Sequence, residues 1–394
     1  MIDNYGVCIQ WHCGKRSFYP MPKICHFSSS HRPDDTRVAH KEVNSLSQYF
    51  DDVTLVTHHH EKLTKIFPSI HYVDTGVSMP QKRWQRITIG AWRVYRAAVK
   101  VNADIYHFHD PELLPYVIAL RLRRKKVIYD VHEDLAKDIR SKVWIPKVFR
   151  SIIATMVDLV EKTLSRFCSA VVPACEPMTE IFYPYNKNTI AINNYPELAL
   201  YPSQPGLKKR QACYLGTITR TRGIKQAIEA CHRANIKLVL GGNFHDEILF
   251  AECKAMPGWE NVEWLGYIPH DQAIAIISQS LVGLLLQTFT QHYQPIKLYE
   301  YMASGIPVIA SDYQQWIDIV EKNKLGFCVD PHSIDSICEA LNQLLADESM
   351  AQQMGAQAKD YVSQHYSWEQ EAQKLYKLYE SLASPQAQSV RSKT

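Results

Sequence analysis

The sequence predicts an α/β protein of two Rossmann-like domains, each a doubly wound parallel sheet with helices on both faces. Three observations lead to this prediction. The chain has 394 residues, which is long for one domain, and its 46% apolar and 21% charged residues are typical of a globular protein. Short runs rich in Val, Ile and Leu alternate with helical stretches, as buried parallel strands require. A Pro- and Gly-containing segment at 202–209 has linker composition and divides these runs into two series.

The predicted strands lie in two sets, one on each side of that linker. The first set comprises 23–27, 53–57, 105–108, 126–131 and 170–173, and the second comprises 212–215, 237–240, 262–265, 282–286, 307–310 and 327–329. Ser367 followed by Gln370 forms a capping box at the start of the last helix. The predicted parts are an N-terminal domain 1–201 with an extension 1–20, a C-terminal domain 202–366, a final helix 367–384 and a frayed tail 385–394.

Composition limits the classes of partner and compartment. The net charge of +4 is too small to argue for a nucleic-acid partner. Ten cysteines occur singly, without a CxxC pair, which favours reduced thiols and the cytoplasm. The opening residues lack the apolar core of a signal peptide, and we find no apolar run long enough to span a bilayer.

The most informative segment, 294–312, predicts an anion site. Pro295 suits the first turn of a helix, and Gly305 suits the residue just past its end. The N–H groups of residues 296–298 would then face the carboxyl edge of the sheet, where a diphosphate can bind. Lys297 adds a positive charge there, and Glu300 is placed to accept hydrogen bonds from a ribose. A plain helix start with a surface Lys–Glu pair explains the same residues equally well.

The run P-I-K-L-Y-E-Y-M-A-S-G-I-P-V-I-A resembles the donor-binding signature of retaining GT-B glycosyltransferases of family 4. The resemblance spans about residues 23 to 380. It implies two domains facing a cleft and a last helix that returns to the N-terminal domain. Members of the family usually carry a pair of glutamates, and Glu300 matches the second, ribose-binding one. His292 stands at the first position, so this chain departs from the pattern.

A second segment, 214–224, supports the resemblance. In the family, the turn after this strand carries basic residues that neutralise the diphosphate, and Arg222 matches one of them. Thr217 stands at the other basic position, and Arg220 is the candidate to replace it. An Arg fork binds phosphate oxygens in pairs, although exposed loop arginines are the ordinary explanation for such a patch alone. The donor-binding residues that the resemblance implies are Gly216, Arg220, Arg222, Tyr267, Ile268, Gln294, Pro295, Ile296, Lys297 and Glu300.

The N-terminal half places polar clusters after three predicted strands, at the edge where open α/β sheets bind ligands. These clusters resemble the acceptor half of bacterial surface-polysaccharide transferases, which implies that His132 faces the reacting centre. The implied acceptor-side residues are His31, Asp35, Arg37, His109, Asp110 and Glu133. A metal is the alternative for His and carboxylate ligands, but no strand or helix spacing fixes a closed site, and structural hydrogen bonding remains a further alternative. We therefore expect no metal.

The expected activity is transfer of a sugar, with retention, from a nucleotide sugar to a growing glycan in surface-polysaccharide synthesis. A UDP-sugar donor and a lipid-linked acceptor are the favoured substrates. Arg222, Lys297 and the helix start are expected to stabilise the negative charge on the departing diphosphate. No Asp-x-Asp motif occurs to hold a metal, so we expect that no cofactor is required. A nucleotide-sugar epimerase of the same fold and an inactive sugar-nucleotide-binding subunit remain alternatives. No GxGxxG follows a strand, which argues against a dehydrogenase.

The segment 142–167 mixes apolar and basic residues. The apolar ones include Trp144, Ile145, Phe149, Ile152, Ile153 and Met156, and the basic ones are Lys142, Lys147, Arg150, Lys162 and Arg166. This mixture suits peripheral contact with an anionic cytoplasmic membrane face, and a core-facing helix explains most of it equally well.

Overall fold

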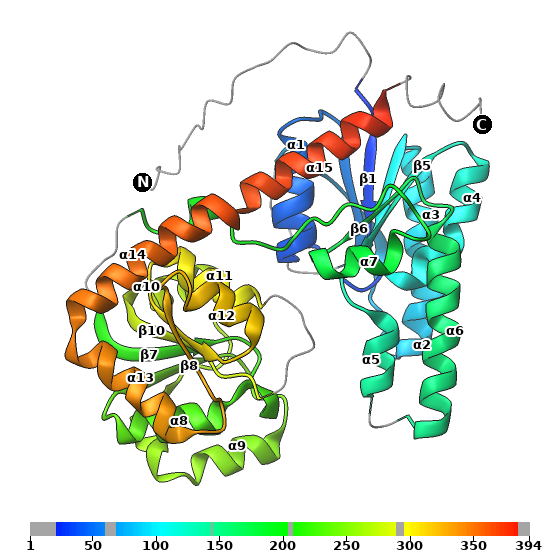
Figure 1. The fold of residues 1–394 in the computed structure, drawn as a ribbon. Helices are drawn as coiled ribbons and strands as arrows, with labels where there is room; N and C mark the ends of the chain where they lie inside the picture. The colour runs from blue at the N-terminus through cyan, green and yellow to red at the C-terminus, as the bar shows by residue number, and fades with distance from the viewer. Residues whose placement is uncertain (1–20, 60–67, 143–144, 204–207, 289–294, 385–394) are drawn as a thin grey trace. The chain divides into compact units, whose positions relative to one another are not determined.

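The structure is a computed structural model that describes residues 21–59, 68–142, 145–203, 208–288 and 295–384 (Figure 1). Contacts divide the chain into two compact units, Met1–Ile128 with Tyr379–Thr394, and Tyr129–Leu378. This division falls inside a strand of the first sheet, whereas the boundary expected from the linker composition lies at residue 201. The linker-based domain boundaries therefore stay a prediction.

The first sheet has six strands in the order β3-β2-β1-β4-β5-β6. Its strands are β1 (Ile24–Phe27), β2 (Val53–His59), β3 (His71–Ser78), β4 (Ile105–Phe108), β5 (Lys126–Val131) and β6 (Ala170–Pro173). Pairing is parallel from β3 through β2 and β1 to β4. The sequence did not predict β3, because this edge strand is mostly exposed and half-buried and so lacks the continuous apolar run of a central strand.

The second sheet repeats this topology, with the order β12-β11-β10-β7-β8-β9. Its strands are β7 (Lys209–Leu215), β8 (Lys237–Gly241), β9 (Val262–Trp264), β10 (Ser280–Leu285), β11 (Val308–Ser311) and β12 (Gly326–Val329). The strand pairs of this sheet are all parallel. Both sheets thus have the doubly wound order, and the predicted fold is confirmed.

Both faces of the second sheet are buried. Along β7, Ala212 and Tyr214 lie in one apolar core, whereas Cys213 and Leu215 lie in the other. Successive side chains of a strand point to opposite faces, so this alternation requires helices on both sides. The near-continuous apolar content of the strands, which predicted the fold, follows from the same cause.

The helices follow the strands in βα alternation (Figure 1). Before β7 they are η1 (Thr36–Val43), α1 (Asn44–Ser47), α2 (Arg83–Gln85), η2 (Arg86–Gly90), α3 (Ala91–Val101), η3 (Pro111–Tyr116), α4 (Val117–Leu122), α5 (Leu135–Ser141), α6 (Lys147–Ser165), η4 (Glu176–Met178), α7 (Thr179–Phe182) and η5 (Leu198–Leu200). After β7 they are η6 (Arg220–Arg222), α8 (Ile224–Arg233), α9 (Glu247–Lys254), η7 (Pro257–Asn261), α10 (His270–Gln279), α11 (Ile296–Ala303), α12 (Gln314–Val320), α13 (Ile334–Ala346), α14 (Glu348–His365) and α15 (Trp368–Ala383). Within the described residues, no helix is both long and apolar enough to cross a membrane.

Ser367 caps the last helix, α15, as predicted, whereas the side-chain amide of Gln370 donates to the carbonyl of Gln364 at 3.1 Å. The hydroxyl of Ser367 accepts a hydrogen bond from the N–H of Gln370 at 3.4 Å. The helix starts in the second unit, and its residues from Tyr379 onward belong to the first. Within the first unit, the Tyr379 hydroxyl lies 2.8 Å from Nδ1 of His107 and 2.9 Å from Nε2 of His26. These contacts attach the end of α15 to β1 and β4.

Glu161 on α6 is a buried carboxylic acid. The Tyr129 hydroxyl on β5 donates to it at 2.6 Å, and the side chain is 5% exposed. Burial raises the pKa of Glu161 to about 7, because the charged form loses its hydration. Above this pKa the folded protein must hold a buried carboxylate.

We therefore expect Glu161→Gln to stabilise the protein increasingly as pH rises. An unfolded Glu releases its proton near its ordinary pKa, while folded Glu161 retains it until about pH 7. The wild type thus loses about 3 kcal/mol of stability across this window relative to the Gln variant. Urea unfolding of both proteins at pH 5 and pH 8 measures the difference. The exposed Glu180→Gln is the control, and an equal effect of Glu161→Gln at both pH values would contradict the prediction.

Candidate functional site

The second sheet has its topological switch point between β7 and β10, where neighbouring connections run to opposite sides. In doubly wound sheets, ligands bind outside the carboxyl ends of the strands at this point. The loops after β7, β8 and β9 are joined here by backbone hydrogen bonds, Gly216 N to Gly241 O at 2.8 Å and Gly242 N to Gly266 O at 2.6 Å. The strand ends therefore form one connected rim.

Gly223 fixes the turn that carries Arg222. Its φ of +65° is in the left-handed region, and a Cβ there would lie 1.9 Å from the carbonyl oxygen of Leu286. The N–H of Thr288 donates to the carbonyl of Thr221 at 3.0 Å, which holds the same turn against the loop after β10. Arg222 is half-buried and therefore stands on a rigid turn at the switch point.

Helix α11 has the predicted ends. Pro295 caps its start, and Gly305 follows its end with a φ of +67°. One detail of the prediction is wrong, because the N–H of Leu298 donates to the carbonyl of Pro295 at 3.0 Å and is not left for an anion. The site at the helix start is therefore smaller than predicted and involves Ile296 and Lys297.

Lys297 lies beside the Gly216 loop. A Cβ built on Gly216 would lie 3.3 Å from Cε of Lys297, so the absence of a side chain there leaves room for the lysine. The ammonium of Lys297 forms an ion pair with the carboxylate of Glu300, one turn further along α11. The structure thus brings Gly216, on the loop after β7, next to Lys297 and Glu300 on α11.

Glu300 is buried and charged. Burial alone raises the pKa of this carboxyl, but Lys297 and His270 overcome that effect and lower the pKa to about 2. His270 is the first residue of α10, and its Nε2 lies 3.5 Å from the other oxygen of Glu300. Sequence reasoning missed His270, although its position directly after the Tyr267–Pro269 turn was the available signal. The result is an ionised acceptor of hydrogen bonds at the rim of the sheet.

Arg220 occupies a different environment from Arg222. Its guanidinium bonds to Asp246 at 3.0 Å and to Glu252 at 2.8 and 3.2 Å, and these are residues at the start of and within α9. Two carboxylates already neutralise this cation, whereas Arg222 stands on the turn fixed by Gly223. The structure therefore supports Arg222 more strongly than Arg220 as a diphosphate ligand.

The remaining donor-side residues lie on the same rim. Cδ1 of Ile268 lies close to Gly241, since a Cβ built on Gly241 would be 2.8 Å from it. Tyr267 beside it is 76% exposed, so its ring is accessible to a ligand. Gln294 and His292 lie outside the described residues.

In the first unit, Asp110 organises the loop after β1. Its carboxylate accepts hydrogen bonds from the Ser28 hydroxyl at 2.7 Å and the Ser29 N–H at 2.6 Å, and His31 Nδ1 lies 3.2 Å away. Burial alone raises the pKa of Asp110, but the bonds from His31 and the serines hold it well below its usual range. His31 and Asp110 therefore lie together, with Asp110 in the interior, and their acceptor-side role stays a prediction.

The other acceptor-side residues of this unit have structural partners. Asp35 caps η1 by accepting from the N–H groups of Arg37 and Val38, both at 2.9 Å. Arg37 is 4% exposed, and its Nε lies 3.0 Å from a carboxylate oxygen of Glu42. Their assignment to an acceptor pocket stays a prediction.

His132 and Glu133 follow β5 at its carboxyl end. Nε2 of His132 lies 2.9 Å from the carboxylate of Asp130, which is buried within the strand. This contact fixes the orientation of the imidazole, which is partly exposed, while Glu133 is exposed. An imidazole oriented by a carboxylate is suited to hydrogen-bond a substrate hydroxyl.

The sequence spacing indicated no metal site, but the fold of the first unit gathers four residues that could serve as metal ligands, so the expectation of no metal stays a prediction. One ligand atom from each of His26, Glu42, His107 and His109 lies within 4.8 Å of the others. The parallel register pairs His26 with His107, and His109 returns to the same face two residues later. These residues form a hydrogen-bonded network. Nδ1 of His26 lies 3.0 Å from Nε2 of His109, and Nε2 of His26 contacts the hydroxyl of Tyr379. Only the strand register reveals this grouping.

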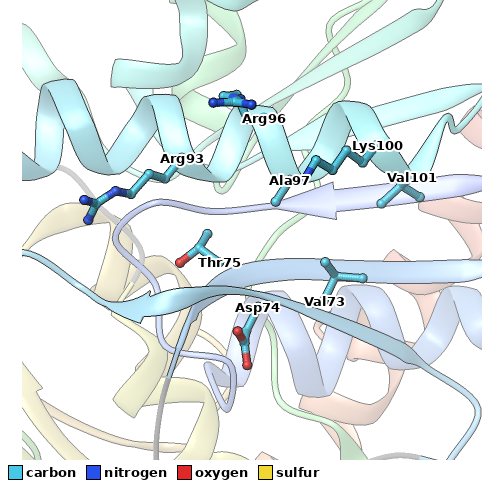
Figure 2. A pocket seen from close by; sticks show the side chains of 8 residues that line it. All are labelled: Val73, Asp74, Thr75, Arg93, Arg96, Ala97, Lys100 and Val101. Atoms are coloured by element: carbon cyan, nitrogen blue, oxygen red, sulfur yellow. The ribbon is translucent and has the colours of Figure 1, made fainter.

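A shallow hollow of about 460 Å³ lies between β3 and α3 (Figure 2). Its lining residues are Val73, Asp74, Thr75, Arg93, Arg96, Ala97, Lys100 and Val101. Figure 2 shows the three cationic side chains on α3 and Asp74 on β3. The hollow shares no residue with either predicted set, and exposed cations along a helix are ordinary surface features.

Two family models match the chain, one in each half. Glycosyltransferase Family 4 matches residues 36–188, and Glycosyl transferases group 1 matches residues 202–361. The GDP-mannose-dependent alpha-(1-6)-phosphatidylinositol monomannoside mannosyltransferase of Mycobacterium tuberculosis is 37% identical over 76 residues, 19% of this chain and 20% of that protein. That match thus spans about a fifth of the relative's length.

Longer similarities exist at lower identity. The phosphatidyl-myo-inositol mannosyltransferase of Mycobacterium leprae is 22% identical over 306 residues, covering 74% of this chain and 77% of that protein. The solved structure of Anabaena HepE in complex with UDP-glucose has a TM-score of 0.68 at 16% identity, covering 91% of this chain and 100% of that chain. This likeness shows a shared fold. The chain thus has the two-sheet GT-B fold and consists of a Glycosyltransferase Family 4 domain in its first half and a Glycosyl transferases group 1 domain in its second half.

Proposed function

We propose that the protein transfers a sugar from a nucleotide-sugar donor, with retention, to a growing glycan in surface-polysaccharide synthesis. The observation that carries the proposal is the meeting of Gly216, Lys297 and Glu300 at the switch point of the second sheet. A cation beside an open glycine loop suits a diphosphate, and a buried carboxylate one helical turn away suits a ribose. These are two parts that UDP-sugars and GDP-sugars share.

In this proposal, the donor lies along the carboxyl edge of the second sheet, where the loops after β7, β9 and β10 begin. Glu300 accepts the ribose hydroxyls, while Lys297 and Arg222 meet the diphosphate. The turn with Tyr267 and Ile268 borders the base. HepE, whose fold this chain shares, binds UDP-glucose, which supports a UDP-sugar as the donor.

Catalysis in the proposal rests on fixed positive charge at the leaving group. Negative charge grows on the diphosphate as the glycosidic bond to the donor breaks. Arg222 is held on a rigid turn and Lys297 on α11, so both are in place before the charge develops. Attack from the face that the diphosphate leaves would give retention.

In this proposal, the acceptor is a glycan whose reducing end is attached to a lipid. Two mycobacterial relatives are named for transfer to phosphatidylinositol lipids, which supports an acceptor of this class. His132 orients the reacting sugar, and His31, Asp110 and Glu133 belong to the acceptor side. Arg37 and His109 support that side from the interior, and half-buried Asp35 supports it by capping η1.

Glu300→Ala should weaken nucleoside diphosphate binding by roughly ten- to a hundredfold, about 1.5–3 kcal/mol, because a ribose would lose a charged hydrogen-bond acceptor. Isothermal titration with UDP measures this directly. Glu300→Gln is the matched variant, since it keeps one acceptor oxygen and should lose less. An unchanged dissociation constant for UDP in Glu300→Ala would remove the ribose assignment.

Product analysis distinguishes the proposed function from its rivals. The protein is incubated with candidate nucleotide sugars, with and without glycan acceptors. Acceptor-dependent release of free nucleotide supports a transferase. An epimerase would convert the nucleotide sugar without an acceptor, and an inactive binding subunit would bind it and release nothing.

A further inference from the structure

We propose that the outward face of α6 docks the protein onto an anionic lipid bilayer. Seven large apolar side chains of this helix are 39% to 73% exposed. They are Val148, Phe149, Ile152, Ile153, Met156, Leu159 and Val160, here called the α6 stripe. At 3.6 residues per turn they fall within an arc of about 140° on one side of the helix.

The opposite side of α6 faces the protein. The buried residues of the helix are Ala154, Glu161 and Ser165, which lie together on the helical wheel and opposite the α6 stripe. The Tyr129 hydroxyl donates to Glu161, and the side-chain amide of Asn186 donates to the carbonyl of Ser165 at 2.9 Å. Figure 1 shows α5 beside α6. The helix is thus anchored by a small, polar face and presents its apolar face outward, the reverse of an ordinary surface helix.

The charges around the α6 stripe determine which partner fits it. Lys147 and Arg166 are exposed at its two ends. Lys162 forms an ion pair with Asp158 at 2.7 Å, and Glu161 is buried. Exposed basic groups therefore stand at both ends of α6, Arg166 on the side of the α6 stripe and Lys147 on the other side, and the arc of the α6 stripe contains no acidic residue. Such a surface is typical of helices that lie in the interface of a bilayer with anionic headgroups.

A second copy of the chain fits this face less well. Antiparallel packing of two α6 helices would place the Lys147 end of one against the Arg166 end of the other, and parallel packing would pair like ends. Both arrangements bring cations together next to a dry interface, where their repulsion is costly. Anionic lipid headgroups instead supply the opposite charge at both ends and an apolar layer between them.

Vesicle flotation of the full chain tests the proposal. Vesicles of phosphatidylcholine with about one third phosphatidylglycerol are compared with pure phosphatidylcholine at low and high salt. We expect binding to the anionic vesicles that falls with added salt, because screening removes the attraction of the basic residues. The double variant Phe149→Ser with Leu159→Ser should reduce the partition coefficient at least about tenfold, since two large apolar side chains no longer enter the lipid.

Matched variants separate docking from general surface effects. Leu200→Ser with Ile248→Ser removes the same number of exposed apolar side chains elsewhere and should leave vesicle binding unchanged. The double variant Lys147→Glu with Arg166→Glu should lower binding to anionic vesicles, by about fivefold or more for each side chain whose charge is reversed. UDP binding of every variant provides an independent check of folding, because the donor residues lie outside α6.

Three results would overturn the proposal. The first is a wild-type protein that does not float with anionic vesicles while it still binds UDP. The second is a Phe149→Ser, Leu159→Ser variant that floats as well as the wild type. The third is a wild-type dimer in sedimentation that this variant converts to a monomer, which would assign the α6 stripe to self-association. The second and third results do not depend on whether the sugar-transfer proposal holds, whereas the first uses UDP binding only as a sign that the protein is folded.

Discussion

Arg222→Ala is expected to lower kcat about a hundred- to a thousandfold while changing KM for the donor much less. Charge on the diphosphate grows in the transition state, so a fixed cation there contributes more to the transition state than to the bound substrate. The turn that holds Arg222 is fixed by Gly223 against the loop after β10, which leaves the side chain little freedom to relax. Steady-state kinetics with saturating acceptor measure both constants.

Arg220→Ala is the control for this experiment. Arg220 stands two residues away but bonds to Asp246 and Glu252, so its charge is already compensated. We expect Arg220→Ala to change kcat only slightly, far less than Arg222→Ala does. If Arg222→Ala raised only KM, the residue would anchor the donor without assisting bond cleavage. An equal loss in both variants would instead restore Arg220 as a second diphosphate ligand.

His132→Ala is expected to remove most sugar transfer, with a loss of about a hundredfold or more, while UDP binding stays nearly normal. The imidazole is oriented by Asp130 at 2.9 Å and stands at the carboxyl end of β5. Loss of an oriented group misplaces the reacting sugar, and small misplacements reduce rates strongly. Transfer assays and UDP titration on the same preparation separate the two effects.

Two further variants define the role of His132. The exposed His365 on α14 is the matched control, and His365→Ala should transfer sugar normally. Asp130→Asn leaves His132 in place but weakens its orientation, so we expect an intermediate loss in kcat. If His132→Ala reduced UDP affinity as much as transfer, the residue would serve the donor side or the fold, and its assignment to the reacting centre would fail.

Strand and helix patterns predicted much of this protein. The apolar runs located eleven of the strands because central parallel strands are buried on both faces. Pro295 and Gly305 fixed the ends of α11, and the Ser367 cap fixed the start of α15, because these ends depend on local backbone geometry. The edge strand β3 escaped prediction because its residues are exposed or half-buried, so it has no continuous apolar run.

Pairings between distant residues required the structure. His270 meets Glu300 because α10 and α11 start at the same edge of the sheet, which no local pattern encodes. The pairing of His26 with His107 depends on the register of β1 with β4, and Glu42 joins them from η1. The sequence offered both Arg220 and Arg222 as diphosphate ligands, and only their tertiary neighbours show that Arg220 is compensated by carboxylates whereas Arg222 stands on a fixed turn at the switch point.

The sequence by itself determined the two doubly wound sheets, the family and the residue types of the donor site, because local periodicity and short motifs specify them. The tertiary structure alone decided which charges meet. It showed that the carboxylate of Glu300 contacts both Lys297 and His270. It also showed that Glu161 is a buried acid and that the apolar side of α6 faces outward. Burial and charge pairing are properties of a residue's neighbours in space, and helical periodicity cannot tell which side of an amphipathic helix the protein covers.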